Sequence, residues 1–219
     1  MAALADPHWE TVTSEIRDLM QFIGRQPFAT RFYLAGGTAL ALQIGHRRSI
    51  DLDFFSQHDP VQRATRQEVI HALTRFGPTV VEDVDGNLLL EIPNLHIAFL
   101  SYGYPLARPT VEVENVALAS ITDVGLMKLD ALISRGSRKD FYDVYFVAQQ
   151  TSIDELLALG RAKYPYARDF EVMAVESLVL FDNAEGDLQP ELLVELPWSE
   201  VKRFFRAEGR RLGRGWLGR

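Results

Sequence analysis

Apolar and polar positions in the first half of the chain follow two spacings, and each spacing predicts one kind of element. Residues 9–25 and 61–76 carry apolar side chains at helical spacing, which predicts two amphipathic helices. Asp85-Gly86 is a hairpin signal between two β-prone runs. Strands are predicted at 31–35, 49–55, 79–83, 87–92 and 95–102. The first half therefore predicts a mixed α/β unit around a small sheet.

The second half of the chain has helical spacing almost throughout. Gly103, Pro105 and Pro109 interrupt the pattern between the two halves. Helices are predicted at 121–135, 138–150, 152–162, 168–181 and 198–211. We therefore expect an α/β (α+β) protein: an α/β core with an N-terminal helix over residues 1–118, and a helical C-terminal region over 119–219 that packs on this core.

Two aspartates stand two residues apart in the predicted strand at 49–55. Leu52 and Phe54 occupy the alternate positions, so Asp51 and Asp53 share the opposite face. With Cα atoms about 6.6 Å apart, their carboxylates can converge on Mg²⁺, which binds one or two protein carboxylates together with substrate phosphates. The pair is a candidate metal site. Two ordinary acids on a solvent-facing strand are the alternative.

Gly36-Gly37-Thr38 joins a predicted strand to a predicted helix that Gly45 ends. The free amides and partial positive charge of a helix N-terminus favour phosphate, and glycine lets a phosphate approach the backbone closely. Thr38 is predicted to cap the helix and to add a hydroxyl donor. A tight turn without a ligand is the alternative, but the aspartate pair that follows favours a phosphate site.

His46, Arg47, Arg48 and Ser49 lie between this turn and the aspartates. The two arginines could reach a triphosphate or RNA, and at least one could instead be a surface charge. Arg48 and Ser49 are taken as candidate nucleotide-binding residues.

Charge is unevenly distributed along the 219 residues, whose net charge is −7. This acidic balance argues against a general nucleic-acid coat, but the end of the chain is basic. A basic tail can contact a polyanion, or it can be the solvated face of a terminal helix. Its cations are Lys202, Arg203, Arg206, Arg210, Arg211, Arg214 and Arg219, against one acid, Glu208. Cysteine is absent, which excludes disulfides, thiolate metal sites and a cysteine nucleophile.

The stretch YLAGGTALALQIGHRRSIDLDFF resembles the first motif of the AbiEii/AbiGii toxin-type nucleotidyltransferases, in the DNA polymerase β-like superfamily. A second block, from Met127-Lys128 to Arg135-Gly136-Ser137-Arg138-Lys139-Asp140-Phe141-Tyr142-Asp143, also resembles that family. The resemblance implies a polymerase β-like core and Mg²⁺-dependent nucleotide transfer. It further implies that Asp51 and Asp53 are metal ligands and that Gly36, Gly37 and Thr38 hold the triphosphate. By the same likeness Lys128 contacts the nucleotide phosphates and Asp140 belongs to the last active-site motif.

The second block also has a purely structural interpretation. Lys128 and Arg135 share one helix face, and so do Asp140 and Asp143, so an ion-pair network between two helices is expected. Ser137 with Asp140 fits a capping box.

The third carboxylate usual in polymerase β-like enzymes is not apparent. On the predicted strand at 95–102, His96 and Ala98 share a face, and Ala98 stands where an aspartate is expected. Glu91 could substitute from the adjoining segment. His96 could accept a proton, because the ordinary pKa of histidine lies near neutrality.

The sequence thus predicts an enzyme that moves an NMP group from an NTP to a hydroxyl acceptor such as RNA or tRNA, in a toxin–antitoxin or phage-defence system with a cognate antitoxin. One alternative is a non-catalytic relative that binds a nucleotide or a partner. The other is a transferase acting on an antibiotic-like small molecule. The N-terminus has no signal-peptide pattern and no run spans a bilayer, so we expect no membrane contact and a cytoplasmic location.

Overall fold

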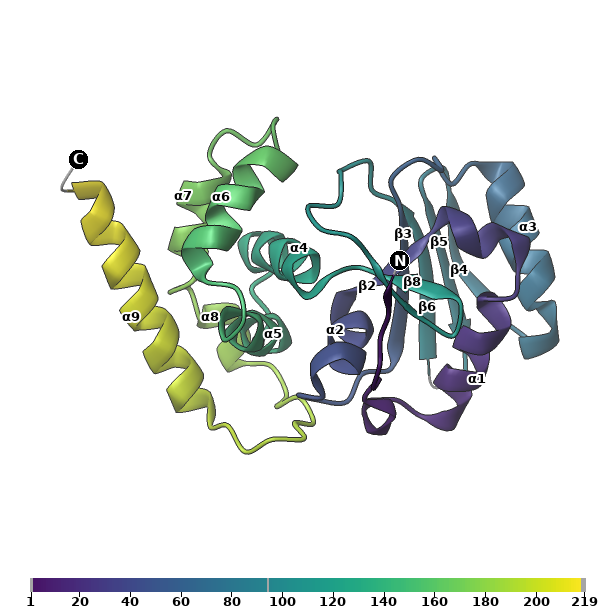
Figure 1. The fold of residues 1–219 in the computed structure, drawn as a ribbon, viewed down its shortest axis with the longest axis horizontal. Helices are drawn as coiled ribbons and strands as arrows, with labels where there is room; N and C mark the ends of the chain where they lie inside the picture. Colours follow the sequence, from purple (N-terminus) through teal and green to yellow (C-terminus); the bar gives the residue numbers. More distant parts are fainter. Residues whose placement is uncertain (1, 94, 218–219) are drawn as a thin grey trace. The chain divides into compact units, whose positions relative to one another are not determined.

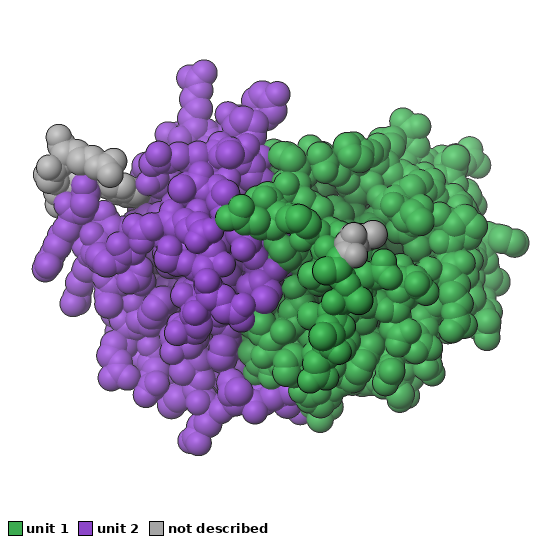
Figure 2. Space-filling model, in the orientation of Figure 1, with its two compact units in different colours: residues 1–120 green, residues 121–219 purple. Residues whose placement is uncertain are grey.

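A computed structural model describes residues 2–93 and 95–217. The chain divides into two compact units, residues 1–120 and 121–219, which we call unit 1 and unit 2 (Figures 1 and 2). Each is described by itself. Within the described ranges, none of the helices combines the length and apolar character needed to cross a membrane.

Unit 1 is built on a mixed sheet of the order β1-β7-β8-β2-β3-β6-β5-β4. Its strands are β1 (Ala2–Ala3), β2 (Tyr33–Ala35), β3 (Asp51–Ser56), β4 (Thr79–Val84), β5 (Asn87–Ile92), β6 (Leu95–Ser101), β7 (Val111–Val113) and β8 (Val116–Leu118). Its helices are α1 (Ser14–Ile23), α2 (Gly36–Ile44) and α3 (Arg63–Leu73). Helices α1 and α3 lie on one side of the sheet and α2 on the other (Figure 1).

The centre of the sheet positions the aspartates. Strand β3 pairs antiparallel with β2 and parallel with β6. Its alternating burial confirms the predicted faces, since Leu52 and Phe54 are buried while Asp51 and Asp53 are partly exposed. Phe54 stacks on Phe99 of β6, with ring centroids 5.0 Å apart. This apolar packing anchors the strand so that the opposite face can carry charged groups.

The sequence does not predict three strands of unit 1, which are β1, β7 and β8. The two-residue β1 pairs with β7, and β7 forms a hairpin with β8 that joins β2. The hairpin turn places Glu114 and Asn115 at φ values of 51° and 61°. Without a glycine in the turn, the hairpin signal is weak. The predicted hairpin at Asp85-Gly86 is confirmed between β4 and β5.

Unit 2 is helical, as predicted. It contains α4 (Ile121–Ser134), α5 (Arg138–Ala148), α6 (Ile153–Lys163), α7 (Phe170–Ser177), α8 (Asp182–Glu185) and α9 (Trp198–Leu217). Phe141 of α5 lies at the centre of an aromatic cluster that includes Phe181, Trp198 and Phe205. This cluster joins the last helix to the rest of the unit and supplies much of its apolar core.

Candidate active site

Helix α2 begins directly after β2, and its first turn is Gly36-Gly37-Thr38. The first amides of a helix have no partner within the helix, and Ala35 at the N-cap has no side-chain oxygen to accept from them. These N–H groups and the helix dipole favour an anion at this end. The predicted cap by Thr38 is wrong, because Thr38 lies inside the first turn. Its buried hydroxyl contacts Ser49 Oγ at 2.8 Å and donates to the Asp51 carbonyl.

The aspartates lie beside this turn. Asp53 is directly opposite Ala35 in the β2–β3 ladder, so it stands next to the residue that leads into α2. Asp51 shares its face two residues earlier. The contact from Thr38 to the Asp51 carbonyl fixes the helix start against the same strand. The Gly36-Gly37-Thr38 turn and the carboxylate pair, separate in sequence, are thus neighbours in unit 1.

Gly36 is required by the geometry of this site. Its φ is +67°, and a Cβ atom placed on it would lie 2.6 Å from Asp53 Oδ2. A side chain would therefore both strain the backbone and displace the carboxylate. The backbone of Gly36 and the position of the Asp53 carboxylate therefore depend on each other.

For the nucleotidyl transfer that the family resemblance implies, we expect Gly36→Ala to lower the rate by about a hundredfold, because a misplaced reacting group can cost that much. Gly77→Ala is the matched control, since Gly77 also has a positive φ, +63°, but nothing lies within 4 Å of its Cβ position. Both variants should lose about 1–2 kcal/mol from the left-handed backbone alone. Denaturant unfolding and transfer assays check this, and equal activities in the two variants would show that Asp53 needs no close approach to the turn.

The two arginines before β3 differ in their surroundings. Arg48, taken as the nucleotide-binding arginine, is exposed, whereas Arg47 is buried. The Arg47 guanidinium lies where a side chain on Gly37 would be, and its Nη1 donates to the Arg48 carbonyl at 2.9 Å. A guanidinium group is chemically suited to bind phosphate, and this one lies against the Gly36-Gly37-Thr38 turn. The sequence predicts that either arginine could reach a triphosphate and takes Arg48 as the candidate, because nothing in two adjacent arginines shows which one turns inward.

Ala98 is the residue at which the family resemblance leads us to expect a third carboxylate. Ala98 is directly opposite Asp53 in the parallel β3–β6 pair, and His96 is opposite Asp51. Glu91 of β5 is opposite His96, one strand further from the aspartates. Among the described residues, no group of three or more acids or histidines could hold a metal ion. The acids of the site are therefore Asp51 and Asp53.

Lys128 and Asp140, the candidates in the second block, meet inside unit 2. Lys128 Nζ lies 2.8 Å from Asp140 Oδ1 and 2.7 Å from Asp143 Oδ2. Arg135 Nε lies 2.7 Å from Asp140 Oδ2, which confirms the ion-pair network expected between these helices. Ser137 is the N-cap of α5, but its hydroxyl donates to the Asp140 carboxylate at 2.6 Å instead of capping the helix. The predicted capping box is therefore wrong.

The surroundings of Asp140 favour the ionised form of its carboxyl group. Burial by itself raises the pKa of the Asp140 carboxyl, but the hydrogen bonds from Arg135 and the charges of Lys128 and Arg135 outweigh it. The net result is a pKa well below the ordinary range of aspartate. Asp140 thus stabilises the packing of α4 and α5, and the nucleotide contact expected of Lys128 remains a prediction.

Solved structures that are similar to this chain include nucleotidyltransferases. The structure of MenT4, a nucleotidyltransferase toxin from Mycobacterium tuberculosis, has a TM-score of 0.56 at 16% identity, covering 87% of this chain and 81% of MenT4. The antibiotic-resistance factor ANT(2'')-Ia has a TM-score of 0.53 at 14% identity, covering 71% of this chain and 95% of that protein. At such identities the likeness shows the fold, which is that of the nucleotidyltransferase class.

The family follows from sequence. The model described as "Nucleotidyl transferase AbiEii toxin, Type IV TA system" matches residues 17–208, and the chain belongs to this family. Its sequence is also 32% identical over 197 residues to the "Uncharacterized protein aq_aa25" of Aquifex aeolicus (strain VF5), covering 88% of this chain and 93% of that protein.

Proposed function

We propose that this protein transfers an NMP group from an NTP to a hydroxyl of RNA, with tRNA as one candidate acceptor. The observation that carries the proposal is the contact geometry in unit 1, where the Asp53 carboxylate lies against Gly36 at the start of α2. One site thus offers amides for phosphate oxygens and carboxylates for a cation. This pairing suits a metal-bound triphosphate.

The residues present fit a single Mg²⁺ ion that arrives with the nucleotide. Asp51 and Asp53 supply two hard oxygen ligands on one partly exposed face, and Ala98 supplies none. Mg²⁺ usually takes one or two protein carboxylates and completes its shell with phosphates and water. When bound, the ion would neutralise charge on the triphosphate and on the leaving pyrophosphate.

The chain's own groups would position the reacting atoms. The amides of Gly36 and Gly37 would bind phosphate oxygens, and the buried Arg47 guanidinium would add a fixed positive charge beside them. The acceptor hydroxyl would then form a bond to the α-phosphorus and release its proton to water as the bond to pyrophosphate breaks. Positioning and charge stabilisation supply most of the catalysis in phosphoryl chemistry of this kind.

The direct test is incubation of the protein with each labelled NTP, Mg²⁺ and total RNA, with aminoglycosides offered in parallel. Label on RNA is the expected result. Label on an aminoglycoside alone would replace RNA by an antibiotic-like acceptor. Nucleotide binding by calorimetry without any transfer would favour the non-catalytic alternative, which Ala98 opposite Asp53 motivates.

Substitution of Ala98 examines the missing carboxylate. Ala98 is buried directly opposite Asp53 on a strand about 4.8 Å away. Ala98→Asp should lower the Mg²⁺ concentration that gives half-maximal transfer by about tenfold, because it adds a third hard ligand. Ala98→Asn is the control of equal shape without the charge. An unchanged Mg²⁺ dependence in Ala98→Asp would show that position 98 does not face the ion.

A toxin role would follow from depletion of a functional RNA, and it would require a cognate antitoxin in the cytoplasm, where NTPs and RNA occur. Co-expression with the product of a neighbouring gene for a small DNA-binding protein should restore growth of cells that express this chain. Growth inhibition should also depend on Asp51, since transfer is proposed to cause it.

A further inference from the structure

Helix α9 presents two distinct faces. Val201, Phe205 and Leu212 are buried and hold one face against the rest of unit 2. Gly209 also lies on this face, because a Cβ on it would lie 2.7 Å from Val179. Taking a step of about 100° per residue, the opposite side of the helix is centred near Arg210.

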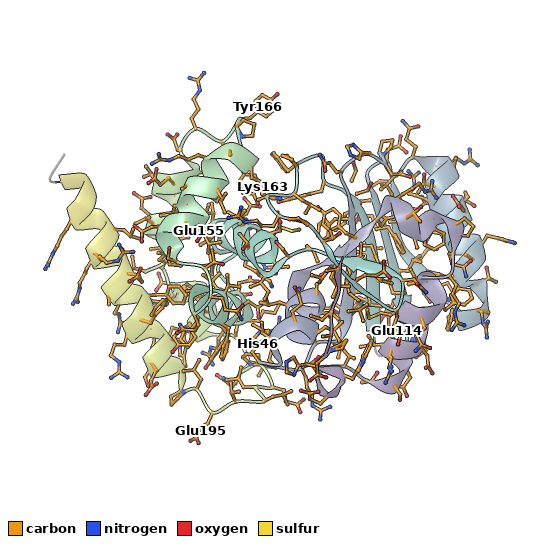
Figure 3. The ribbon with its side chains drawn as sticks, in the orientation of Figure 1. His46, Glu114, Glu155, Lys163, Tyr166 and Glu195 are labelled. Atoms are coloured by element: carbon orange, nitrogen blue, oxygen red, sulfur yellow. The ribbon has the colours of Figure 1, made fainter. Side chains whose placement is uncertain are left out.

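Arginine dominates that opposite side. Arg203, Arg206, Arg210 and Arg214 fall within an arc of about 80° centred opposite Val201, and all four are exposed. The one other residue of the arc with a described side chain is Ser199. We call these four residues the arginine stripe. Nitrogen-tipped side chains extend away from α9 in Figure 3. An ordinary solvated face mixes charges of both signs, so four arginines without an acid in the arc are unusual.

Lys202 and Arg211, the other basic residues of α9, form ion pairs within unit 2. Lys202 lies 2.6 Å from Glu185, and Arg211 pairs with both Asp154 and Glu208. The contacts with Glu208 and Asp154 raise the pKa of Arg211, and the one with Asp154 ties α9 to α6. Both cations flank the buried face, and their charges are neutralised within unit 2. They are structural cations and leave the stripe as the charged surface of the helix.

Among the residues that the structure describes, the arginines of the stripe make fewer ion pairs within unit 2 than Lys202 and Arg211 do. Arg203 lies 3.3 Å from Glu200, one turn earlier on the same helix, and Arg206 lies over the ring of Phe181 with its Cζ atom 5.4 Å from the centroid. Within the described part of the chain, no acid forms an ion pair with Arg210 or Arg214. Exposed ion pairs contribute little, so even Arg203 can exchange its partner.

Phosphate is the group that such a surface recognises best. Guanidinium groups match phosphate oxygens with two parallel hydrogen bonds. At 1.5 Å per residue, the stripe extends over about 16 Å, which allows contacts with several phosphates of one strand. A membrane surface would need an exposed apolar face on the helix, and that face of α9 is buried. Interfaces between proteins have an apolar centre, whereas nucleic-acid interfaces are polar and positively charged.

We propose that the arginine stripe of α9 binds the phosphate backbone of the RNA acceptor. The choice of RNA as the nucleic acid rests on the proposed function, while the stripe itself defines a polyanion surface. The net charge of −7 strengthens the inference, because a chain that is acidic elsewhere concentrates cations on this helix. The stripe contacts phosphates and so contributes affinity without reading the base sequence.

The test measures binding of a fluorescein-labelled single-stranded RNA oligonucleotide by anisotropy, without NTP, to the full chain. The variant Arg206→Gln/Arg210→Gln/Arg214→Gln should bind at least about tenfold more weakly at low salt. The slope of log K against log salt should fall in magnitude by about 2, since each single-strand phosphate contact contributes about 0.7. Arg25→Gln/Arg63→Gln/Arg168→Gln is the matched control, because it removes three exposed arginines outside α9.

Equal weakening in both triple variants would overturn the proposal, since a general charge effect would then explain binding. Tighter, stripe-dependent binding of an acidic peptide or an anionic vesicle than of RNA would overturn it as well. The transfer assay separates this proposal from the proposed function. RNA binding that depends on the stripe, in a protein that shows no transfer, would support the stripe proposal and contradict the proposed function. Transfer to RNA in the stripe variant with an unchanged KM for RNA would overturn the stripe proposal and leave the proposed function in place.

Discussion

Asp51→Asn is expected to lower nucleotidyl transfer by about a thousandfold or more while leaving the fold intact. The lost carboxylate is one of the two acids of the site, and a bound metal supplies several kcal/mol of transition-state stabilisation. At about 1.4 kcal/mol per factor of ten, losing most of that contribution gives an effect of this size. Asp53→Asn should behave in the same way.

Stability should change little in Asp51→Asn. Asp51 is partly exposed, and its hydrogen bond with Thr38 uses the backbone carbonyl, which the substitution retains. We expect the free energy of unfolding to stay within about 0.5 kcal/mol of the parent. Asp18→Asn is the control, since it removes one charge from an exposed position of α1. Transfer by Asp51→Asn at the parental rate, measured with labelled NTP, would exclude Asp51 from the metal site.

Asp140→Asn is expected to act mainly on stability, with a loss of about 3 kcal/mol. Removing one partner of a buried ion pair typically costs 3–5 kcal/mol, and the lower end applies because Lys128 keeps Asp143. Arg135, whose side chain is 55% exposed, can turn toward water. Denaturant unfolding followed by tryptophan fluorescence can report the change, because Trp198 packs on Phe141 of α5.

The effect should depend on pH with a definite sign. The pKa of Asp140 is depressed in the folded protein, so the carboxylate contributes stability above the unfolded pKa of about 3.9 and loses it as the pH falls below that value. The difference between the parent and Asp140→Asn should therefore be constant near neutrality and shrink below about pH 4. Asp169→Asn, an exposed control in the same unit, should show little difference at any pH.

The same variant separates two roles of the second block. At a temperature where Asp140→Asn is fully folded, transfer per folded molecule should remain measurable if the network only packs α4 against α5. Its complete loss would support the contact with nucleotide that the family resemblance implies for Lys128 and Asp140.

Local periodicity accounts for what could be predicted of the fold. Alternation along β3 placed Asp51 and Asp53 on one face, because side chains alternate on any strand whatever lies around it. The Asp85-Gly86 hairpin and the helical second half follow from equally local signals. The β7–β8 hairpin was missed because Glu114 and Asn115 reach their positive φ values without a glycine to mark the turn.

Neighbouring positions in sequence can face different surroundings, and here local signals fail. Arg47 and Arg48 are adjacent and chemically identical, yet Arg47 lies buried against Gly37 and Arg48 is exposed. Thr38 and Ser137 are both residue types that cap helices, but neither hydroxyl caps its helix. The Thr38 hydroxyl contacts Ser49, which the fold brings near, and the Ser137 hydroxyl donates to the carboxylate of Asp140 three residues along, which Lys128 and Arg135 also hold. A hydroxyl side chain can bond to the nearby backbone or to another side chain. Packing decides between the two, and the residue type does not show which one is formed.

The sequence by itself determined the two elements of the site, the Gly36-Gly37-Thr38 turn and the Asp51–Asp53 pair, because turn chemistry and strand alternation are properties of a few consecutive residues. Tertiary structure alone decided that Asp53 lies against Gly36 and Ala98 lies opposite Asp53. It also decided which arginines of α9 are neutralised and which form the stripe. These outcomes depend on strand register and helix packing, which join residues far apart in the chain.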